Sequence, residues 1–385
     1  MNAIVEKIKA AYELEHQLNR EAVSEDELPL SFQEITPRWL TAILCGKVRG
    51  AEVLSVKLGP VDNGSSNRRR LHIEYNHEGT HAKLPTAIFC KATHDLANRI
   101  VLGVSGGGIC EANFYNQIRP LLPIEAPVPY FARFDEETYN SMIMLGDLSD
   151  TVTEFCNHNT NMTRARAESQ MRLLGKLHGA CYGHEILSRR LGIFPTFKEF
   201  FACSMQFGLR EGTDAGFLAA REVIPARLYA RHAEIWDATI AAVDEGDRLP
   251  NTLSHGDVHL KNWYVAGSGE MGLSDWQCCG RAHWGRDVAY AISCALTVEN
   301  RRLWERDLLS LYLDEMHRAG GPKIAFDDAW TSYRAQIVSA LAWWTVTLCP
   351  PPGLPDMQPR DITIEFIKRI ATAMDDVDTL ALFKA

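Results

Sequence analysis

The sequence has no long hydrophobic run and no surplus of basic residues, and each absence excludes a class of protein. No apolar stretch reaches the 18 or so residues that a membrane-spanning helix needs. Lys and Arg number 40 against 49 Asp and Glu, whereas proteins that bind DNA or RNA neutralise its phosphates with a basic surplus. We therefore expect a protein that binds neither nucleic acid nor a membrane.

The sequence also lacks paired cysteine motifs and a secretory leader. Its ten cysteines are scattered from Cys45 to Cys349 without a CxxC pair, which is typical of reduced, buried thiols. The first residues, MNAIVEKIKAAYELEHQL, alternate charged with apolar residues where a signal peptide would carry an apolar block. These features predict a cytoplasmic protein.

The chain is 385 residues long, 46% hydrophobic and 23% charged, which indicates a globular protein with two domains. We predict an amino-terminal lobe over residues 1–146. Two leading helices, the second beginning at Thr36 and Pro37, precede the strand patterns VLSVKL, RRLHIEY and AIFCKA. A helical period follows at 109–122, and YNSMIMLGDL (139–148) reads as a buried strand.

Residues 147–385 follow a helical period almost throughout and form the second predicted lobe. The interruption is residues 251–287, where the short strand patterns WYVA and MGLS flank the turn GSGE. The predicted fold class is therefore α+β, with an antiparallel sheet lobe followed by a mainly helical lobe.

The strongest motif is HGDVHLKN, which places Asp257 two residues after His255 and five before Asn262. The catalytic loop of protein kinases has this spacing, with an Asp that accepts a hydroxyl proton and an Asn that binds magnesium. If GSGE turns a hairpin, Asn262 faces Asp275 across it. Mg²⁺ needs only one or two such oxygen ligands from the protein, so we predict that these two residues bind it.

A kinase also needs a cation on the nucleotide phosphates, usually a strand lysine held by a helix glutamate. Lys91 lies inside the strand pattern AIFCKA, and Glu111 begins the helical pattern EANFYNQI. A lysine in the middle of a strand is costly unless its amine reaches water or a partner. We predict that Lys91 and Glu111 form an ion pair.

HGDVHLKN, followed by LSDWQ and then GRDVAY, resembles the catalytic segment of the aminoglycoside phosphotransferase and choline kinase-like family. The resemblance extends upstream through EANFYNQIRPLL and MLGDL. It implies a two-lobed protein-kinase-like fold and a small-molecule kinase that uses ATP and Mg²⁺. By resemblance, Asp257 is the catalytic base, and Asn262 and Asp275 bind magnesium. Lys91 and Glu111 form the nucleotide-binding pair, in which Lys91 holds the phosphates and Glu111 holds Lys91.

The same resemblance assigns residues around this centre. Residues 144–148, with Leu145 and Asp147, correspond to the hinge against which adenine stacks. The catalytic loop is supported by His255, His259 and Asp287. Where protein kinases carry GxGxxG, this chain has VDNGSSNRRR, so the nucleotide-binding loop reduces to Gly64, Ser65 and Ser66.

Two other chemistries stay open. LGVSGGG (102–108) contains GxSxG around Ser105, the pattern of a serine hydrolase's nucleophile elbow. His255, Asp257 and His259 alternate along an extended segment and could bind zinc in a metal-dependent hydrolase. A binding module that has lost catalysis is disfavoured because the whole kinase set is retained.

The sequence therefore predicts an ATP-dependent phosphotransferase that acts on a small hydroxylated molecule. Choline-like amino alcohols, aminoglycosides, sterols and other alcohols all stay open as acceptors, because neither fold nor motif identifies one.

Overall fold

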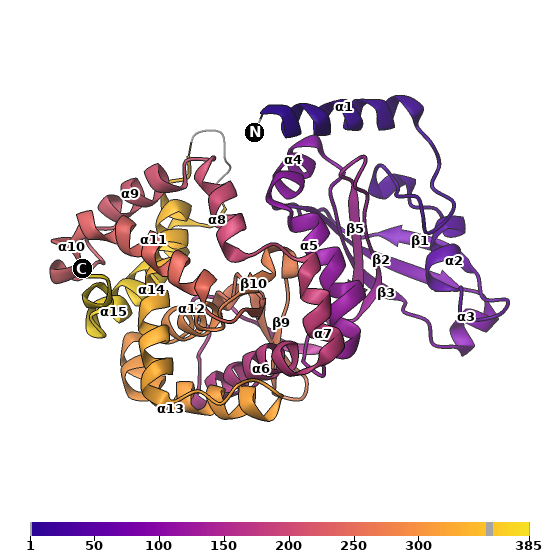
Figure 1. Cartoon of the computed structure of the whole chain (residues 1–385). Helices are drawn as coiled ribbons and strands as arrows, with labels where there is room; N and C mark the ends of the chain where they lie inside the picture. The colour runs from indigo at the N-terminus through magenta and orange to yellow at the C-terminus, as the bar shows by residue number, and fades with distance from the viewer. Residues whose placement is uncertain (1, 352–356, 385) are drawn as a thin grey trace. The chain divides into compact units, whose positions relative to one another are not determined.

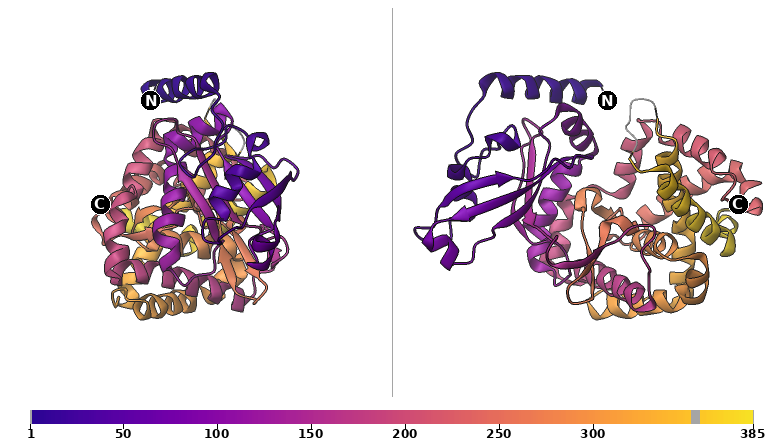
Figure 2. Two further views of the ribbon diagram at one scale, coloured as in Figure 1. Left: turned by 90° about the vertical axis from the view of Figure 1, so that its right-hand side faces the viewer. Right: turned by 180° about the vertical axis from the view of Figure 1, so that it is seen from behind.

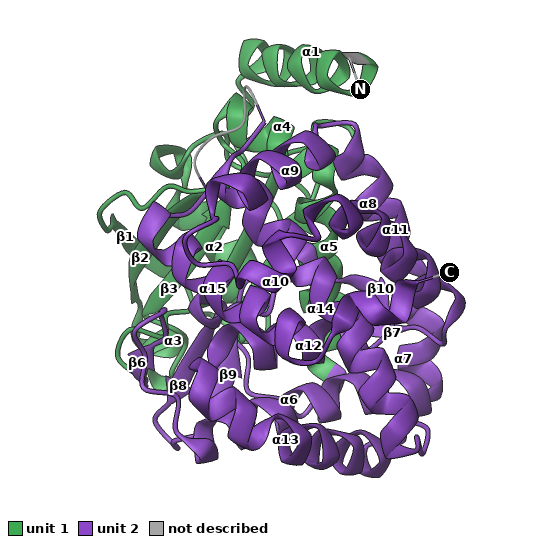
Figure 3. Cartoon of the chain, turned by 90° about the vertical axis from the view of Figure 1, so that its left-hand side faces the viewer, with its two compact units in different colours: residues 1–120, 127–151 green, residues 121–126, 152–385 purple. Residues whose placement is uncertain are grey.

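The computed structural model describes residues 2–351 and 357–384. The chain divides into two compact units, which Figure 3 draws in different colours. Unit 1 comprises Met1–Pro120 and Pro127–Thr151, and unit 2 comprises Leu121–Ala126 and Val152–Ala385. The chain therefore enters unit 2 briefly at Leu121–Ala126 before it completes unit 1.

Unit 1 is built on a five-stranded antiparallel sheet with the strand order β1-β2-β3-β5-β4 (Figure 1). The four strand patterns predicted in this half all form strands, and β4 was not predicted. The central strands β3 and β5 pair Lys91 with Ile143. The strands are β1 (Val53–Leu58), β2 (Asn67–Tyr75), β3 (Ala87–Ala92), β4 (Pro129–Phe134) and β5 (Ser141–Gly146).

The helices of unit 1 include both predicted leading helices. Thr36 caps the second one, since its side chain accepts a hydrogen bond from the Trp39 N–H at 3.1 Å. The helix predicted over 109–122 begins at Gly107, and its last two turns are a π-turn (Phe114–Ile118) and a 3₁₀ turn (Arg119–Leu121). The helices are α1 (Asn2–Leu18), α2 (Pro37–Leu44), α3 (His77–His81), α4 (Leu96–Ser105) and α5 (Gly107–Asn113).

Helix α1 lies against α4, as Figures 1 and 2 show from different sides. Arg99 of α4 is fully buried, and its guanidinium contacts the Glu15 carboxylate and lies 4.9 Å from the Tyr12 ring centre. Ile8 is also fully buried. A buried cation needs a partner, so Glu15 fixes α1 on α4.

Unit 2 is mainly helical. The helix predicted from RARAESQMRLLGKLHGACYG spans the whole of that segment as α6, whereas ARLYARHAEIWDATIAAV is broken into α10 and α11. Every residue of α12 is buried, so α12 forms the centre of the unit. The helices are α6 (Arg164–Gly183), α7 (Glu185–Arg190), α8 (Phe197–Met205), α9 (Leu209–Ala219), α10 (Ala226–Tyr229), α11 (His232–Arg248), α12 (Gly285–Ala295), α13 (Val298–Arg318), α14 (Phe326–Leu348) and α15 (Arg360–Asp376).

Unit 2 also contains two small sheets, one with the strand order β6-β8-β9 and one that pairs β7 with β10. Segment 121–126 joins the first of them: the Leu273 N–H donates to the Glu125 carbonyl at 3.1 Å, and the Tyr264 hydroxyl donates to Glu125 Oε1 at 2.9 Å. The strands are β6 (Val152–Phe155), β7 (Thr252–Ser254), β8 (Trp263–Ala266), β9 (Met271–Leu273) and β10 (Gly280–Ala282).

An antiparallel sheet unit and a mainly helical unit, each with its own core, confirm the predicted α+β organisation in two lobes. Within the residues that the structure describes, no helix is both long enough and apolar enough to cross a membrane.

Candidate active site

The predicted catalytic loop runs from β7 to β8 in unit 2 and ends in a 3₁₀ turn, Leu260–Asn262. Asn262 and Asp257 lie together as predicted. The Asn262 side-chain amide donates to the Asp257 carbonyl at 2.7 Å and to Asp257 Oδ2 at 3.2 Å. The loop is therefore closed by the amide that the motif places five residues after the aspartate.

The Asp257 carboxylate has two further neighbours. The Tyr290 hydroxyl donates to Oδ1 at 3.2 Å, and His259 Nε2 lies 3.4 Å from Oδ2. Burial would raise the pKa of this carboxyl, but His259, His255 and the Tyr290 hydrogen bond together hold it well below its usual range. Asp257 is therefore ionised at neutral pH, with 30% of its side chain exposed.

Asn262 is nearly buried, and its amide has a fixed orientation. Because Nδ2 donates to Asp257, Oδ1 points away from that residue, and no donor from the described part of the chain bonds to it. The Asn262 backbone N–H donates to the His259 carbonyl at 3.0 Å. An oriented amide oxygen with spare lone pairs is a suitable ligand for a hard cation.

The hairpin after Asn262 forms, but its predicted register is wrong by one residue. Trp263 pairs with Leu273 and Tyr264 with Gly272, so Asn262 lies opposite Ser274 and not opposite Asp275. The cause is the turn: the Ala266 N–H donates to the Glu270 carbonyl at 2.9 Å, which leaves a three-residue loop in place of the predicted four. Gly269 closes this loop at φ +87°, the left-handed conformation that a three-residue hairpin loop requires.

Asp275 follows β9 in an unusual backbone conformation. Its φ is +64° and its ψ is 70°, which a non-glycine residue rarely adopts. Such residues gather at functional sites, where the surrounding structure holds them. The preceding residue, Ser274, is the last one paired in the hairpin, and its N–H donates to the Asn262 carbonyl at 2.9 Å. The backbone conformation of Asp275 therefore sets the direction of the chain directly after the hairpin.

Asp287 supports the catalytic loop from the first turn of α12, and it is fully buried. Its carboxylate accepts hydrogen bonds from the Ser254 hydroxyl (2.7 Å), the His255 N–H (2.6 Å) and the Gly256 N–H (3.1 Å), and His178 Nε2 lies at 3.3 Å. Burial would raise the pKa of Asp287, but His178 and nearby Arg286 lower it to about 2. The contacts agree with the structural role expected for this residue.

His255 is fully buried, and both of its ring nitrogens are engaged. Nε2 donates to the Ser274 carbonyl at 2.9 Å, and Nδ1 accepts from the Asp257 N–H at 3.2 Å. Burial lowers the pKa of His255, in keeping with a neutral ring. Neither nitrogen can bind a metal in this arrangement, and the described residues contain no group of three His, Cys, Asp or Glu side chains placed to hold one. The structure therefore does not favour the zinc alternative.

Gly256 occupies the one loop position where a side chain cannot fit. Its φ is +84°, and a Cβ there would lie 2.2 Å from the Cys278 carbonyl oxygen. The Gly256 carbonyl in turn accepts a hydrogen bond from Arg286 Nη1 at 2.7 Å. The backbone before Asp257 is thus held tightly by α12 and by the loop after β9.

In unit 1, the predicted ion pair between Lys91 and Glu111 is present. The Lys91 ammonium lies 2.8 Å from each carboxylate oxygen, and the two residues are 7% and 2% exposed. Lys91 comes from β3 and Glu111 from α5, so the pair joins the central sheet to this helix. A buried pair with bidentate geometry fixes the position of the ammonium group.

The loop between β1 and β2 carries the predicted nucleotide-binding residues Gly64, Ser65 and Ser66. It is closed on itself, since the Gly64 N–H donates to the Ser66 carbonyl at 2.9 Å. Asn98 of α4 donates to the Gly64 carbonyl at 2.8 Å, which ties the loop to the helix. Ser66 is buried, whereas Gly64 and Ser65 are exposed.

The segment predicted as the hinge, residues 144–148, comprises the end of β5 and the two residues after it. Leu145 is buried and pairs with Phe89 of β3. The Asp147 carboxylate accepts from the Ser149 hydroxyl at 2.6 Å and pairs with Arg70 at 3.0 Å. Burial would raise the pKa of Asp147, but Ser149 and Arg70 lower it overall, so its side chain is engaged within unit 1.

Ser105 does not lie in a nucleophile elbow. It is the last residue of α4, its Oγ accepts from the Gly107 N–H at 3.3 Å, and Gly106 turns the chain directly into α5. An elbow requires a strand before the serine, and the helix here replaces it. The structure thus removes the main argument for a serine hydrolase.

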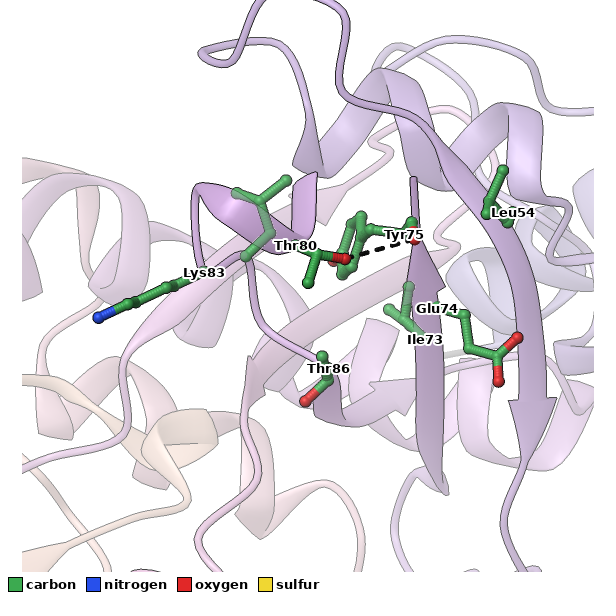
Figure 4. Close-up of a pocket in the computed structure, with 8 residues that line it drawn as sticks. Leu54, Ile73, Glu74, Tyr75, Thr80, Lys83 and Thr86 are labelled. Carbon is green, nitrogen blue, oxygen red and sulfur yellow. Dashed lines mark hydrogen bonds between the residues drawn. The ribbon is translucent and has the colours of Figure 1, made fainter. Parts of the chain in front are cut away.

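Unit 1 also contains an open pocket of about 630 Å³ beside β1, β2 and α3 (Figure 4). Its lining is mostly hydrocarbon with a few hydroxyls, and in Figure 4 the Lys83 side chain points away from the other lining residues. None of the predicted site residues lines it. The lining residues are Leu54, Ile73, Glu74, Tyr75, Thr80, Lys83, Leu84 and Thr86.

Comparison with known proteins places these observations in a family. A model of the phosphotransferase enzyme family matches residues 110–335, more than half of the chain. A search of curated proteins finds no match.

Three solved structures illustrate the structural similarity. A choline kinase from Cryptosporidium parvum is 11% identical, with a TM-score of 0.49 and 93% of each chain covered. A putative aminoglycoside phosphotransferase from Ralstonia eutropha is 11% identical, with a TM-score of 0.48, 88% of this chain and 96% of that chain covered. An ethanolamine kinase from Plasmodium vivax is 12% identical, with a TM-score of 0.47, 84% of this chain and 82% of that chain covered.

Proposed function

Since this chain belongs to the phosphotransferase enzyme family, as its catalytic segment predicts, we propose that it transfers the γ-phosphate of ATP to a hydroxyl of a small molecule. The observation that carries the proposal is the closed loop around Asp257. The ionised Asp257 carboxylate lies beside the side-chain amide of Asn262, five residues later in the sequence. The Asn262 amide nitrogen donates to Asp257, so its oxygen points away from that carboxylate. Hydroxyl activation and metal binding need this pair of groups.

Asp257 receives the hydroxyl of the acceptor in this proposal. A bond forms between the acceptor oxygen and the γ-phosphorus, the bond from that phosphorus to the bridging oxygen breaks, and ADP leaves. The hydroxyl proton passes to Asp257. Because the pKa of Asp257 lies well below its usual range, the carboxylate mainly orients the hydroxyl, and the proton moves late in the step.

Asn262 Oδ1 and the Asp275 carboxylate are the proposed magnesium ligands. Both are oxygen donors, and the Asn262 oxygen is directed away from Asp257, which fits a hard divalent cation. When bound, Mg²⁺ supplies charge neutralisation on the β- and γ-phosphates. The backbone of Asp275 sets the direction in which its carboxylate leaves the hairpin.

Lys91 is the proposed partner of the nucleotide phosphates, with Glu111 holding its ammonium in place. Gly64, Ser65 and Ser66 are proposed to cover the phosphates, and residues 144–148, with Leu145 and Asp147, to hold the adenine. His255, His259 and Asp287 are proposed to support the catalytic loop, in line with their contacts.

The test is a screen of the purified protein with Mg-ATP against amino alcohols, aminoglycosides, sterols, sugars and simple alcohols, read by ADP release and by mass of the product. We expect one class to be phosphorylated. Asp257→Asn should reduce transfer by at least about 1,000-fold and leave the ATP dissociation constant within about twofold, because Asp257 acts on the acceptor. Full transfer by Asp257→Asn, or no acceptor-dependent ADP release from the wild type, would contradict the proposal.

A further inference from the structure

Tyr290 contacts the Asp257 carboxylate from α12 and not from the catalytic loop itself. It lies in α12, three residues after Asp287, so the two side chains project from the same face of the helix. Asp287 holds the backbone N–H groups of the loop, whereas the Tyr290 hydroxyl donates to Asp257 Oδ1 at 3.2 Å. One helix therefore fixes both the backbone and the side chain of the catalytic loop.

The two oxygens of Asp257 are not equivalent. Oδ2 accepts from the Asn262 amide at 3.2 Å and has His259 Nε2 at 3.4 Å, whereas among the described residues the Tyr290 hydroxyl is the one group that bonds to Oδ1. A carboxylate oxygen offers about two lone-pair directions, so Oδ2 has a protein group for each and Oδ1 has a protein group for one. The Asp257 side chain is 30% exposed, so an incoming group can reach part of it.

Tyr290 is suited to act as a permanent donor. It is 3% exposed, and burial raises the pKa of its phenol well above the usual value, so the hydroxyl stays protonated. The hydroxyl cannot turn toward solvent, because Tyr290 lies in α12, a helix in which every residue is buried. A fixed donor on one lone pair of Oδ1 fixes the direction of the other.

We propose that Tyr290 is a positioning residue for phosphoryl transfer, and that it makes Asp257 Oδ1 the atom that receives the acceptor hydroxyl. The inference rests on the proposed function. In the step, the acceptor O–H donates to the free lone pair of Oδ1, the oxygen bonds to the γ-phosphorus as ADP departs, and the proton remains on Oδ1. The Tyr290 hydrogen bond persists throughout and exchanges no proton.

Tyr290→Phe removes the hydroxyl that donates to Asp257 Oδ1 and keeps the aromatic ring. We expect kcat for the best acceptor to fall about 10- to 100-fold, the effect of one hydrogen bond to a charged group, with the KM for Mg-ATP within about twofold. A fall in kcat with an unchanged KM for Mg-ATP separates positioning from a general loss of structure.

Tyr333→Phe is the matched control. Tyr333 is fully buried in unit 2, and its hydroxyl donates to Glu305 Oε2 at 3.1 Å, so its loss removes a similar hydrogen bond away from the catalytic loop. We expect this variant to keep the wild-type kcat, and both variants to unfold at similar urea concentrations.

The possible results distinguish the positioning role of Tyr290 from the proposed phosphotransferase activity. A wild-type kcat in Tyr290→Phe would overturn the positioning role and leave the phosphotransferase intact. Unfolding of Tyr290→Phe at far lower urea than Tyr333→Phe would assign Tyr290 to stability alone and would also overturn it. A wild type that phosphorylates no acceptor would overturn the proposed function, and this inference with it.

Discussion

The Asp287 carboxylate is fully buried and accepts three hydrogen bonds from residues 254–256. His178 Nε2 also lies within hydrogen-bonding distance of it. We predict that Asp287→Asn lowers the free energy of unfolding by about 3 to 5 kcal/mol, because the amide group presents N–H to groups that themselves donate. Urea denaturation measures this loss. Asp244→Asn is the control: its pair with Lys198 is largely exposed, so we expect at most about 1 kcal/mol.

The same carboxyl should govern part of the acid stability. Its pKa is lowered in the folded protein from 3.8 to about 2, so its stabilisation is present above pH 4 and is lost as the pH falls toward 2. The shift corresponds to about 2 kcal/mol. Wild-type stability should therefore fall more steeply between pH 4 and 2 than that of Asp287→Asn; parallel curves would contradict the assignment.

The buried pair of Lys91 and Glu111 allows stability and activity to be separated. Lys91→Met removes the Lys91 ammonium from the buried Glu111 carboxylate, so we expect a loss of about 3 to 5 kcal/mol in unfolding free energy and a large rise in the KM for ATP. Adding Glu111→Gln removes the charge of that carboxylate.

The double variant Lys91→Met/Glu111→Gln should regain most of the stability and none of the ATP affinity. Urea denaturation and steady-state kinetics on the same preparations measure the two effects. If the double variant recovered ATP affinity, Lys91 would have no direct role at the phosphates.

Sequence spacing predicted some contacts of the candidate site and missed others. Asp257 and Asn262 are five residues apart and lie together, and the pair of Lys91 and Glu111 forms, whereas the predicted pairing of Asn262 with Asp275 is wrong by one residue. The contacts of Tyr290 and His178 were not predicted, because they depend on how α12 and α6 pack against the loop. GRDVAY carried the only local signal for Tyr290, since it places Tyr290 one helical turn after Asp287.

Two glycines near the loop have positive φ but different surroundings, which predicts different effects of the same substitution. Gly269→Ala meets no atom within 4 Å, so we expect a cost of about 1 kcal/mol from the left-handed backbone and retained turnover. Gly256→Ala forces a Cβ against the Cys278 carbonyl at 2.2 Å, so the loop must move and turnover should fall by orders of magnitude. Kinetics and urea denaturation of both variants provide the test, and similar turnover in the two would refute it.

Elements with a clear period were predictable, and short strands were predictable where a turn motif marks them, as GSGE does between β8 and β9. The helix α6 and the strands β1, β2, β3 and β5 follow their patterns, whereas β7 and β10 have three residues each, too few to show an alternation. The pattern LGVSGGG suggested a loop or an elbow because glycine disfavours helices, yet α4 continues through Gly103 to Ser105. Packing against α1 outweighs the local propensity there.

For the whole protein, nucleotide binding should appear as a gain in stability. A ligand that binds only the folded chain stabilises it by an amount set by its concentration relative to its dissociation constant, about 2.7 kcal/mol at a 100-fold excess. We predict that Mg-ATP raises the melting temperature of the wild type, and that EDTA removes most of the gain. Asp275→Ala should show little response to magnesium, and a response equal to the wild type would exclude Asp275 as a ligand.

The placement of residues 121–126 in unit 2 has a consequence for synthesis on the ribosome. Unit 1 is otherwise complete at Thr151, but Glu125 pairs with Leu273, which is translated almost 150 residues later. Leu122 and Ile124 of the same segment are both buried in the folded protein. Segment 121–126 therefore cannot complete its hydrogen bonding until β9 has been synthesised, well into the translation of unit 2.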